Sequence, residues 1–240
     1  PEADRVDVSV TFSWDMAEGE RLVRAWAQYY PFVVIGGPAI RPYNGDAFTP
    51  GMYVKQGVTF TSRGCNNHCP WCLVPQREGR LRELPIQPGH IIQDNNFLQC
   101  SLEHRRKVYV MLDRQPKAAV FAGGLDARLV TDEVAAELRA IRISEVFLAC
   151  DTEAALRPLE AAIGRLSFLR RRQLRCYVLC AFGGETIEQA RRRLEAVWQL
   201  GALPFAQLYQ SPDCWIDYDN DWRALAREWS RPAAMFASHS

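Results

Sequence analysis

The chain has little net charge and no long apolar run. Its 29 Lys and Arg residues nearly balance its 28 Asp and Glu residues, so the formal net charge is +1. This balance gives no global attraction to nucleic acid or to a charged membrane surface. No apolar stretch approaches the roughly 20 residues of a membrane-spanning helix, and no signal peptide is recognisable. We therefore expect a cytoplasmic protein with no membrane partner, and nucleic acid is not indicated as a partner.

Lysine is also scarce, so the basic residues are almost all Arg. We interpret this preference for Arg over Lys as a compositional bias of the genome and draw no functional conclusion from it. Two Arg runs, residues 170–172 and 191–193, have a spacing that can indicate nucleic-acid binding. The first is expected just before a strand, at the bottom of the fold, and the second on the outer face of a helix. Both are therefore predicted to be solvated helix faces.

Three of the eight cysteines form the most informative pattern in the chain. Cys65, Cys69 and Cys72 have the spacing CxxxCxxC, and Trp71 stands directly before the last of them. A [4Fe–4S] cluster needs thiolates that converge on a small metal cage, and tight turns that carry cysteines supply them. Three protein ligands for four irons leave one iron open to a substrate or cofactor. The pattern therefore predicts a chemical site, and without an export signal the thiols are expected to be reduced.

This spacing, with the aromatic residue before the third cysteine, resembles the radical S-adenosylmethionine (radical SAM) enzyme family. The resemblance covers residues 56–210. It implies a [4Fe–4S] cluster and S-adenosylmethionine (SAM) as cofactors, with the open iron binding the amino and carboxylate groups of SAM. It also implies reductive cleavage of SAM to a 5′-deoxyadenosyl radical that takes hydrogen from a substrate, here unidentified. The electron donor would be of the flavodoxin or ferredoxin type.

Two other interpretations of the cysteine motif remain open. Thiolates two to four residues apart also suit a structural Zn²⁺ knuckle in a protein that is not an enzyme, although such a site wants four ligands and no second cysteine pair follows closely. Within the family, the alternative is a methyl- or methylthiotransferase that acts on nucleic acid or peptide. Colour would separate a brown iron–sulfur protein from a colourless zinc protein.

Apolar, β-branched runs recur about every 30 residues, the length of one βα unit in a parallel barrel. Each is followed by a turn and a helical pattern. Thr131 and Thr186 are expected to cap two of the helices, and Pro158 to lie in the first turn of a third. The resemblance implies a partial, six-stranded (βα)6 TIM-like barrel, an α/β fold with which this rhythm agrees. The expected strands are residues 58–61, 91–92, 119–122, 146–149, 176–180 and 204–208.

The ends of the chain carry further elements. Residues 1–40 read as a short strand–helix–strand extension that resembles the tail of the cobalamin-binding domain in one radical SAM branch. It has room for one such unit and carries no DxHxxG-like ligand motif, so cobalamin binding is not expected. This extension is expected to extend the barrel sheet or to pack against its edge. Residues 41–56 read as a linker, 57–212 as the barrel, and 213–240 as a C-terminal helix after Asp221 with a disordered tail.

Chemistry in a parallel barrel gathers at the C-terminal ends of the strands. After the second strand, Asp94 and Asn95 stand where the family holds the amino end of SAM; the alternative is a turn before the helix that follows Ser101. After the third, Gly123 and Gly124 would allow close approach of a ligand. The residues that the resemblance makes candidate cofactor contacts are Trp71, Asp94, Asn95, Gly123, Gly124, Asp126, Arg128, Phe182 and Gly183.

Two of these predictions have competing interpretations. Arg128 could pair with the SAM carboxylate, or with Asp126 in a structural ion pair. Residues 181–186 resemble the Gly-Phe-Pro-Gly-Glu-Thr stretch of the methylthiolating and cobalamin-associated branches, which passes along the adenine, but Ala181 and Gly183 depart from it. The cysteines at positions 100, 150, 180 and 214 are expected to serve packing in preference to a second cluster.

Overall fold

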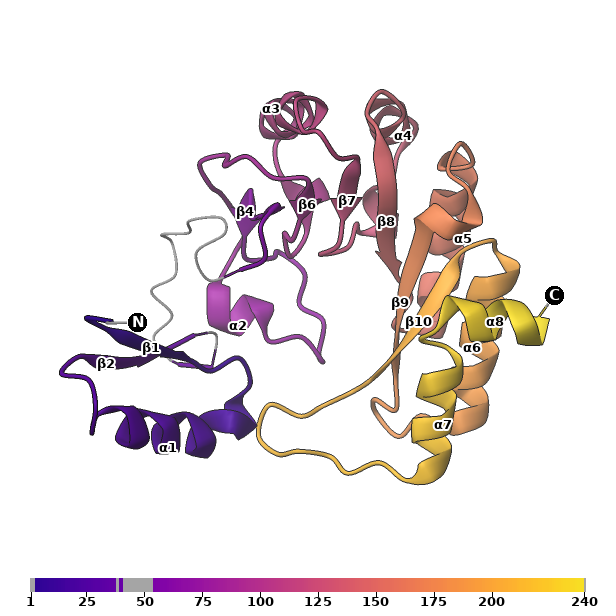
Figure 1. Ribbon diagram of the computed structural model, residues 1–240. Helices are drawn as coiled ribbons and strands as arrows, with labels where there is room; N and C mark the ends of the chain where they lie inside the picture. Colours follow the sequence, from indigo (N-terminus) through magenta and orange to yellow (C-terminus); the bar gives the residue numbers. More distant parts are fainter. Residues whose placement is uncertain (1–2, 38, 41–53, 240) are drawn as a thin grey trace. The chain divides into compact units, whose positions relative to one another are not determined.

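The computed structural model describes residues 3–37, 39–40 and 54–239, which divide into two compact units (Figure 1). The first unit is drawn from residues 1–47 and 210–217, and the second from residues 48–209 and 218–240. The predicted linker, residues 41–56, lies outside the described residues apart from its last three. The division differs from the predicted one, because residues 210–217 join the first unit and the C-terminal helices belong with the sheet.

The second unit is built on a parallel sheet of six strands, and their order across the sheet follows their order in the chain. All five pairings between neighbours are parallel. Each of the six expected strands is therefore confirmed. The first and last strands each have one neighbour, so the sheet is open within the described residues. The strands are β3 (Val58–Thr59), β6 (Ile91–Ile92), β7 (Ala119–Phe121), β8 (Ile143–Ala149), β9 (Leu174–Cys180) and β10 (Leu203–Leu208).

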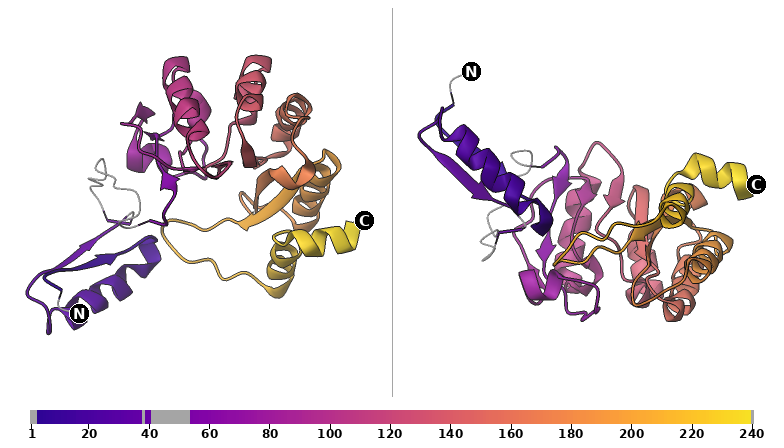
Figure 2. Two further views of the ribbon diagram at one scale, coloured as in Figure 1. Left: turned by 45° about the horizontal axis from the view of Figure 1, so that its top comes forward. Right: turned by 90° about the horizontal axis from the view of Figure 1, so that it is seen from below.

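A helix connects each pair of successive strands from β6 onward. These helices are α3 (Leu102–Asp113), α4 (Asp132–Arg139), α5 (Leu156–Arg165) and α6 (Ile187–Gln199). Figures 1 and 2 show all of them along one face of the sheet. A right-handed crossover between adjacent parallel strands places its helix on a fixed side, so a sheet that runs in chain order has all its helices on one face.

Local sequence sets where these helices begin and end. The Thr131 hydroxyl accepts a hydrogen bond from the backbone N–H of Val134 and so caps α4 as predicted. The predicted capping box of α6 is present: Thr186 and Gln189 exchange hydrogen bonds of 2.8 Å and 3.3 Å. Such caps satisfy N–H groups that have no partner inside the helix.

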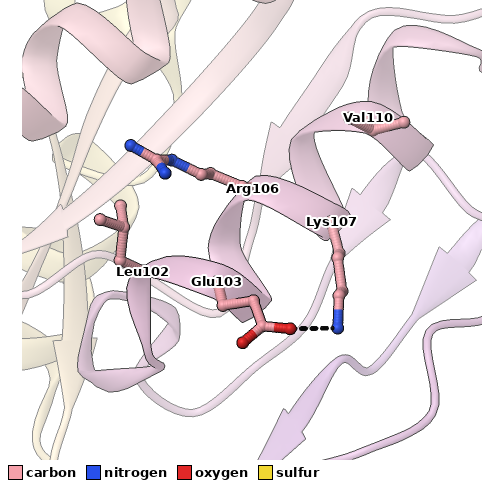
Figure 3. Close-up of a pocket in the computed structure, with 5 residues that line it drawn as sticks. All are labelled: Leu102, Glu103, Arg106, Lys107 and Val110. Carbon is pink, nitrogen blue, oxygen red and sulfur yellow. Dashed lines mark hydrogen bonds and ion pairs between the residues drawn. The ribbon is translucent and has the colours of Figure 1, made fainter.

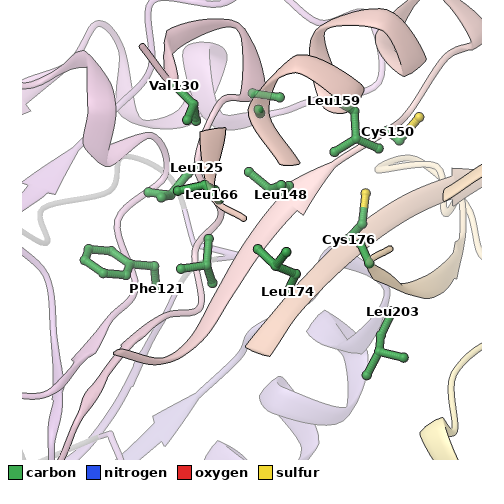
Figure 4. Packing of buried hydrophobic residues seen from close by; sticks show 14 of the residues in the cluster. Phe121, Leu125, Val130, Leu148, Cys150, Leu159, Leu166, Leu174, Cys176 and Leu203 are labelled. Carbon is green, nitrogen blue, oxygen red and sulfur yellow. The ribbon is translucent and has the colours of Figure 1, made fainter. Parts of the chain in front are cut away.

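The core lies between the sheet and these helices (Figure 4). Strand β9 shows the pattern: Leu174, Cys176, Val178 and Cys180 are at most 2% exposed, and the residues between them are partly exposed. Alternate side chains of a strand point to opposite faces, so this pattern assigns one face of the sheet to the helices. The other face carries an aromatic row, in which Phe147 and Tyr177 stack with ring centroids 4.7 Å apart.

Two helices follow the last strand. Helix α7 (Asn220–Glu228) confirms the predicted C-terminal helix, but its cap is Asp219, whose carboxylate accepts from the backbone of Asp221 and Trp222. The prediction chose Asp221, which lies inside the first turn. The predicted disordered tail is wrong for residues 237–239, which belong to α8 (Pro232–His239). The core supports α8, since Met235 is fully buried and Phe236 packs against Trp198.

The segment that carries the cysteine motif lies between β3 and β6. It contains β4 (Ser62–Arg63), β5 (Arg82–Glu83), which pairs with β4 in antiparallel fashion, and α2 (Val74–Glu78). The three cysteines therefore occupy the loop between β4 and α2.

The first unit is a strand–helix–strand motif, as predicted. Strands β1 (Val6–Ser9) and β2 (Val33–Gly36) pair in parallel and are joined by α1 (Met16–Trp26). They form a separate two-stranded sheet, so the first of the two expectations, that they extend the six-stranded sheet, is wrong, and packing against its edge stays a prediction. Residues 210–217 join this unit through a hydrogen bond from Ser13 to the carbonyl of Pro212 and a contact between Trp14 and Trp215.

The Arg runs match the predicted solvated faces only in part: Arg170, Arg172 and Arg192 are exposed, whereas Arg171 and Arg193 make contacts within the protein. Arg193 is 6% exposed and donates hydrogen bonds to Glu185 and to the carbonyl of Leu179, so it stabilises the end of β9. In the other run, Arg171 lies over the Trp198 ring at 4.2 Å. None of the helices within the described residues has the length and apolar character needed to cross a membrane.

Candidate functional site

Six polar, glycine or aromatic positions meet at the edge of the sheet where its strands end. Because all six strands are parallel, their carboxyl ends lie along one edge, and the residues that follow them come together there. The cysteine loop follows the first of these strands. The residues one or two positions past the strand ends are Thr61, Asp94, Gly123, Asp151, Phe182 and Tyr209.

Asp94 fastens the start of the cysteine loop. Its carboxylate accepts hydrogen bonds from the backbone N–H and hydroxyl of Thr61, both at 2.6 Å, and from the hydroxyl of Ser62 at 2.8 Å. Burial raises the pKa of this carboxyl group against these hydrogen bonds, and Asp94 is 1% exposed. Asp94 was expected to contact a cofactor; instead, both its oxygens are engaged within the protein.

Glu78 fastens the loop from its other end. Its buried carboxylate accepts from the Gly64 backbone at 3.3 Å, from the Asn95 amide at 3.0 Å and from Arg77 at 3.1 Å. The Cys65 N–H donates to the carbonyl of Gly79 at 3.2 Å. The Asn95 side chain, also expected near a cofactor, thus supports the loop.

The three cysteines lie close enough together for neighbouring charges to act on the thiols of Cys69 and Cys72. Burial raises the pKa of the Cys69 thiol, and the charges of Cys72, Asp151 and Cys65 raise it further, while Arg128 opposes them. Burial likewise raises the pKa of the Cys72 thiol. A turn sets the spacing of these two cysteines, since the Cys72 N–H donates to the Cys69 carbonyl at 3.0 Å. Positive metal ions would displace the protons of such thiols.

Asp126 and Arg128 form the ion pair that was one of the two expectations. Arg128 Nε and Nη2 donate to the two Asp126 oxygens at 2.9 Å and 2.6 Å. Burial raises the pKa of Asp126, but the hydrogen bonds from Arg128 and Asn67 outweigh it and hold the value at about 2. The Arg128 side chain is 59% exposed, and its charge opposes the rise in the pKa of the Cys69 thiol. The pair therefore stands beside the cysteine loop with its cation accessible.

The backbone requires glycine at both positions after β7, at Gly123 for lack of space and at Gly124 for its conformation. A Cβ on Gly123 would collide with the carbonyl oxygen of Asp94, and Gly124 has a φ of +93°, where side chains are strained. A ligand was expected to approach the backbone closely here. At Gly123 the close neighbour is instead the backbone of Asp94, which follows the adjacent strand.

A chain of aromatic rings crosses the same edge. The rings of Trp71 and Phe182 meet edge to face at 5.4 Å, and those of Phe182 and Tyr209 at 4.9 Å. Trp71 also donates a hydrogen bond to Asp151, whose pKa is raised by burial. The sequence placed Trp71 and Phe182 at one site, and the structure brings them into contact.

Beside these rings is a cavity of about 600 Å³. Its walls include Asp151, Phe182, Gly183 and the buried Arg193. The loop between β9 and α6 has three left-handed residues: Ala181 at φ 66°, Gly183 at 66° and Gly184 at 81°. Gly183 was expected to contact a cofactor, and it lines the space available for one.

Four of the five remaining cysteines lie in the core of the second unit. Cys100, Cys150 and Cys180 are at most 3% exposed within the core, and burial raises the pKa of each thiol to about 12. Cys214 is exposed and belongs to the first unit. Packing accounts for these three buried thiols and for Cys176, which is also fully buried.

A second hollow lies on the outer face of α3, away from the predicted site residues (Figure 3). Its volume is about 580 Å³, and its walls are Leu102, Glu103, Arg106, Lys107 and Val110. Glu103 and Lys107 form an exposed ion pair of 2.7 Å across it.

Four residues of the site were missed by sequence reasoning. Asp151 lies two positions past the end of β8, so the strand-end rule that selected its neighbours would have found it. Asn96 adjoins two residues that were selected. Asn67 and Glu78 gain their roles from contacts across the loop, and no local pattern indicates them.

The donor set fits an iron–sulfur cluster. Three soft thiols stand in one loop, a buried carboxylate holds each end of that loop, and N–H groups donate to the Cys65 sulfur. Each thiolate of a cube binds a different iron, so its ligands need not converge on one point. Within the described residues, no group of three or more His, Cys, Asp or Glu side chains is placed so that it could hold a metal ion, and the cluster stays a prediction.

Comparison with known proteins gives no family assignment: no protein-family model matches the chain, and neither does any curated protein.

Proposed function

We propose that the protein is a radical SAM enzyme whose [4Fe–4S] cluster is held by Cys65, Cys69 and Cys72. The observation that carries this proposal is the place of the three-cysteine loop, at the carboxyl edge of a parallel sheet that runs in chain order. Arg128 and Trp71 stand at the same edge. Sites in parallel α/β folds form at this edge.

We also propose that the sheet is a partial (βα)6 barrel. The support is its unbroken chain order together with helices on one face (Figure 2). A doubly wound sheet would instead reverse its order at a switch point and carry helices on both faces.

Within this proposal each residue has a physical task. A bound cluster would supply the electron that splits the sulfonium of SAM, itself received from a donor of the flavodoxin or ferredoxin type. Arg128 would bind the SAM carboxylate while Asp126 holds its guanidinium in place. Trp71 and Phe182 would form an apolar wall for the adenine. Asp94 and Asn95 would position the loop and leave the cofactor to other groups.

The first test is iron content. Anaerobic reconstitution should load about four irons per chain, and Cys69→Ala should lose most of them because a ligand is gone. Cys214→Ala is the matched control, since Cys214 is exposed and belongs to the first unit, and it should keep its iron. Stoichiometric zinc uptake without iron under the same conditions would contradict the proposal.

The second test is SAM affinity, measured by calorimetry on the reconstituted protein. Arg128→Ala should weaken binding by about 1.5–3 kcal/mol through loss of a charge-assisted pair, with the iron count unchanged. Arg106→Ala, an exposed arginine on α3, should bind SAM as the wild type does. Equal affinity in Arg128→Ala and wild type would assign Arg128 to structure.

A further inference from the structure

Cys65 differs from the other two cysteines in the hydrogen bonds that its sulfur receives. The backbone N–H of Asn67 donates to it at 3.4 Å, and the side-chain Nδ2 of Asn96 at 3.8 Å. The Cys72 sulfur receives one such bond, from the backbone of Val74. Asn96 therefore brings a side-chain donor to one chosen sulfur, where a substitution can remove it.

The neighbourhood fixes which end of the Asn96 amide faces the sulfur. Nδ2 of Asn96 also lies 3.4 Å from Oδ2 of Asp126. An ionised carboxylate only accepts hydrogen bonds, so the amide must present its NH₂ group to this side. Asn96 is 5% exposed, and its Oδ1 is buried without a hydrogen-bond partner among the described residues.

Asp126 holds both asparagines. Its Oδ2 accepts from Asn67 Nδ2 at 2.9 Å, beside the bond from Asn96, and Arg128 binds the same carboxylate through two nitrogens. The carboxylate thus orients both residues that donate to Cys65. An orienting anion of this kind limits the freedom of the donors and keeps their bonds in place.

Hydrogen bonds to the sulfurs of an iron–sulfur cluster are one of the terms that set its reduction potential. Reduction adds negative charge to the cluster and its thiolates, and an N–H donor stabilises that charge. A donor in a buried site acts more strongly because the local dielectric constant is low. Loss of the Asn96 donor should therefore make the cluster harder to reduce.

We infer that Asn96 is a positioning and tuning residue that raises the reduction potential of the proposed cluster through Cys65, held in place by Asp126. This inference rests on the proposed function, since it requires the cluster. It adds a regulation of that site: the ease with which the cluster accepts its electron depends on an amide that touches neither iron nor SAM.

The test is a redox titration of the reconstituted protein without SAM, followed by electron paramagnetic resonance. In Asn96→Ala the equilibrium constant for one-electron reduction should fall about tenfold, which is about 59 mV in midpoint potential. In Asn96→Asp, whose side chain has almost the same shape, the midpoint potential should fall further because the substitution places an acceptor beside the sulfur. Iron content is measured in every sample.

The matched control is Asn66→Ala, which removes an amide from the same loop. Asn66 is exposed, and its side chain accepts from the Leu81 backbone at 3.1 Å, away from the sulfurs. Its midpoint potential should equal that of the wild type.

Three results would overturn the inference. The first is an unchanged potential in Asn96→Ala at full iron content, which leaves the proposed function intact. The second is loss of iron from both folded Asn96 variants, which would make Asn96 a requirement for assembly. The third is a wild-type protein that takes up no iron, in which case the proposed function fails and the inference fails with it.

Discussion

At the scale of single residues, Asp126 connects the cation of the site to its cysteine loop. It binds Arg128 on one side and the Asn67 amide on the other. The sequence indicated the first contact, because the two charges lie two positions apart behind a strand. It could not indicate the second, because Asn67 and Asp126 meet only when the loop after β3 and the loop after β7 share an edge.

Acid should weaken this connection. A carboxyl group whose folded pKa of about 2 lies below the unfolded value stabilises the fold above about pH 4, and this stability is lost as pH falls toward 2. Asp126→Asn should lower the free energy of unfolding at pH 7 by on the order of 2 kcal/mol, and the difference from wild type should shrink between pH 5 and pH 2. Urea unfolding at constant ionic strength measures it.

The control for that experiment is Asp132→Asn. Asp132 pairs with Arg165, but its side chain is 86% exposed. An exposed pair contributes little, so this variant should stay within about 0.5 kcal/mol of wild type at each pH. A difference for Asp126→Asn that does not change with pH would mean that its ionisation does not support the fold.

At the scale of elements, the sequence predicted the strands and most caps correctly. A strand is indicated by an apolar run of a few residues. A helix start is indicated just as locally, by Thr131 for α4 and by Thr186 with Gln189 for α6. The predictions failed where contacts between residues far apart in the sequence determine the structure. Arg193 resembles a solvated helix residue until Glu185 and the end of β9 surround it, and α8 is held by core contacts of Met235.

The loop between β9 and α6 contains a non-glycine residue in an energetically unfavourable backbone conformation. Ala181 has a φ of 66°, a left-handed conformation that costs a residue with a Cβ about 1–2 kcal/mol. Ala181→Gly should therefore raise the free energy of unfolding by about 0.5–1 kcal/mol after the entropy cost of glycine. Thermal or urea unfolding checks the change.

The opposite sign is expected of Ala161→Gly. Ala161 is exposed in the middle of α5, where glycine costs about 1 kcal/mol relative to alanine. If both substitutions destabilise the protein equally, Ala181 does not carry the strain assigned to it.

At the scale of the whole molecule, the strand–helix–strand unit bears on which cofactors the chain needs. The described part of this unit has two strands and one helix between them, plus the segment 210–217. The proposal assigns no cofactor to this unit, and this has a direct experimental consequence for the proposed enzyme.

The reconstituted chain should cleave SAM to 5′-deoxyadenosine when given dithionite, with no cobalamin added. Chromatography of the products measures this, and protein without dithionite is the control. A requirement for cobalamin would make the first unit part of a cofactor site.

The unbroken strand order also governs how the chain acquires its fold. After β3, each strand of the six-stranded sheet pairs with the strand of that sheet that precedes it in the chain. Pairing with the preceding strand closes a shorter loop than pairing across a switch in strand order would, which lowers the entropy cost of each step. During synthesis each new strand meets a finished neighbour as soon as it is exposed, so the sheet can grow in the direction of translation without waiting for the carboxyl terminus.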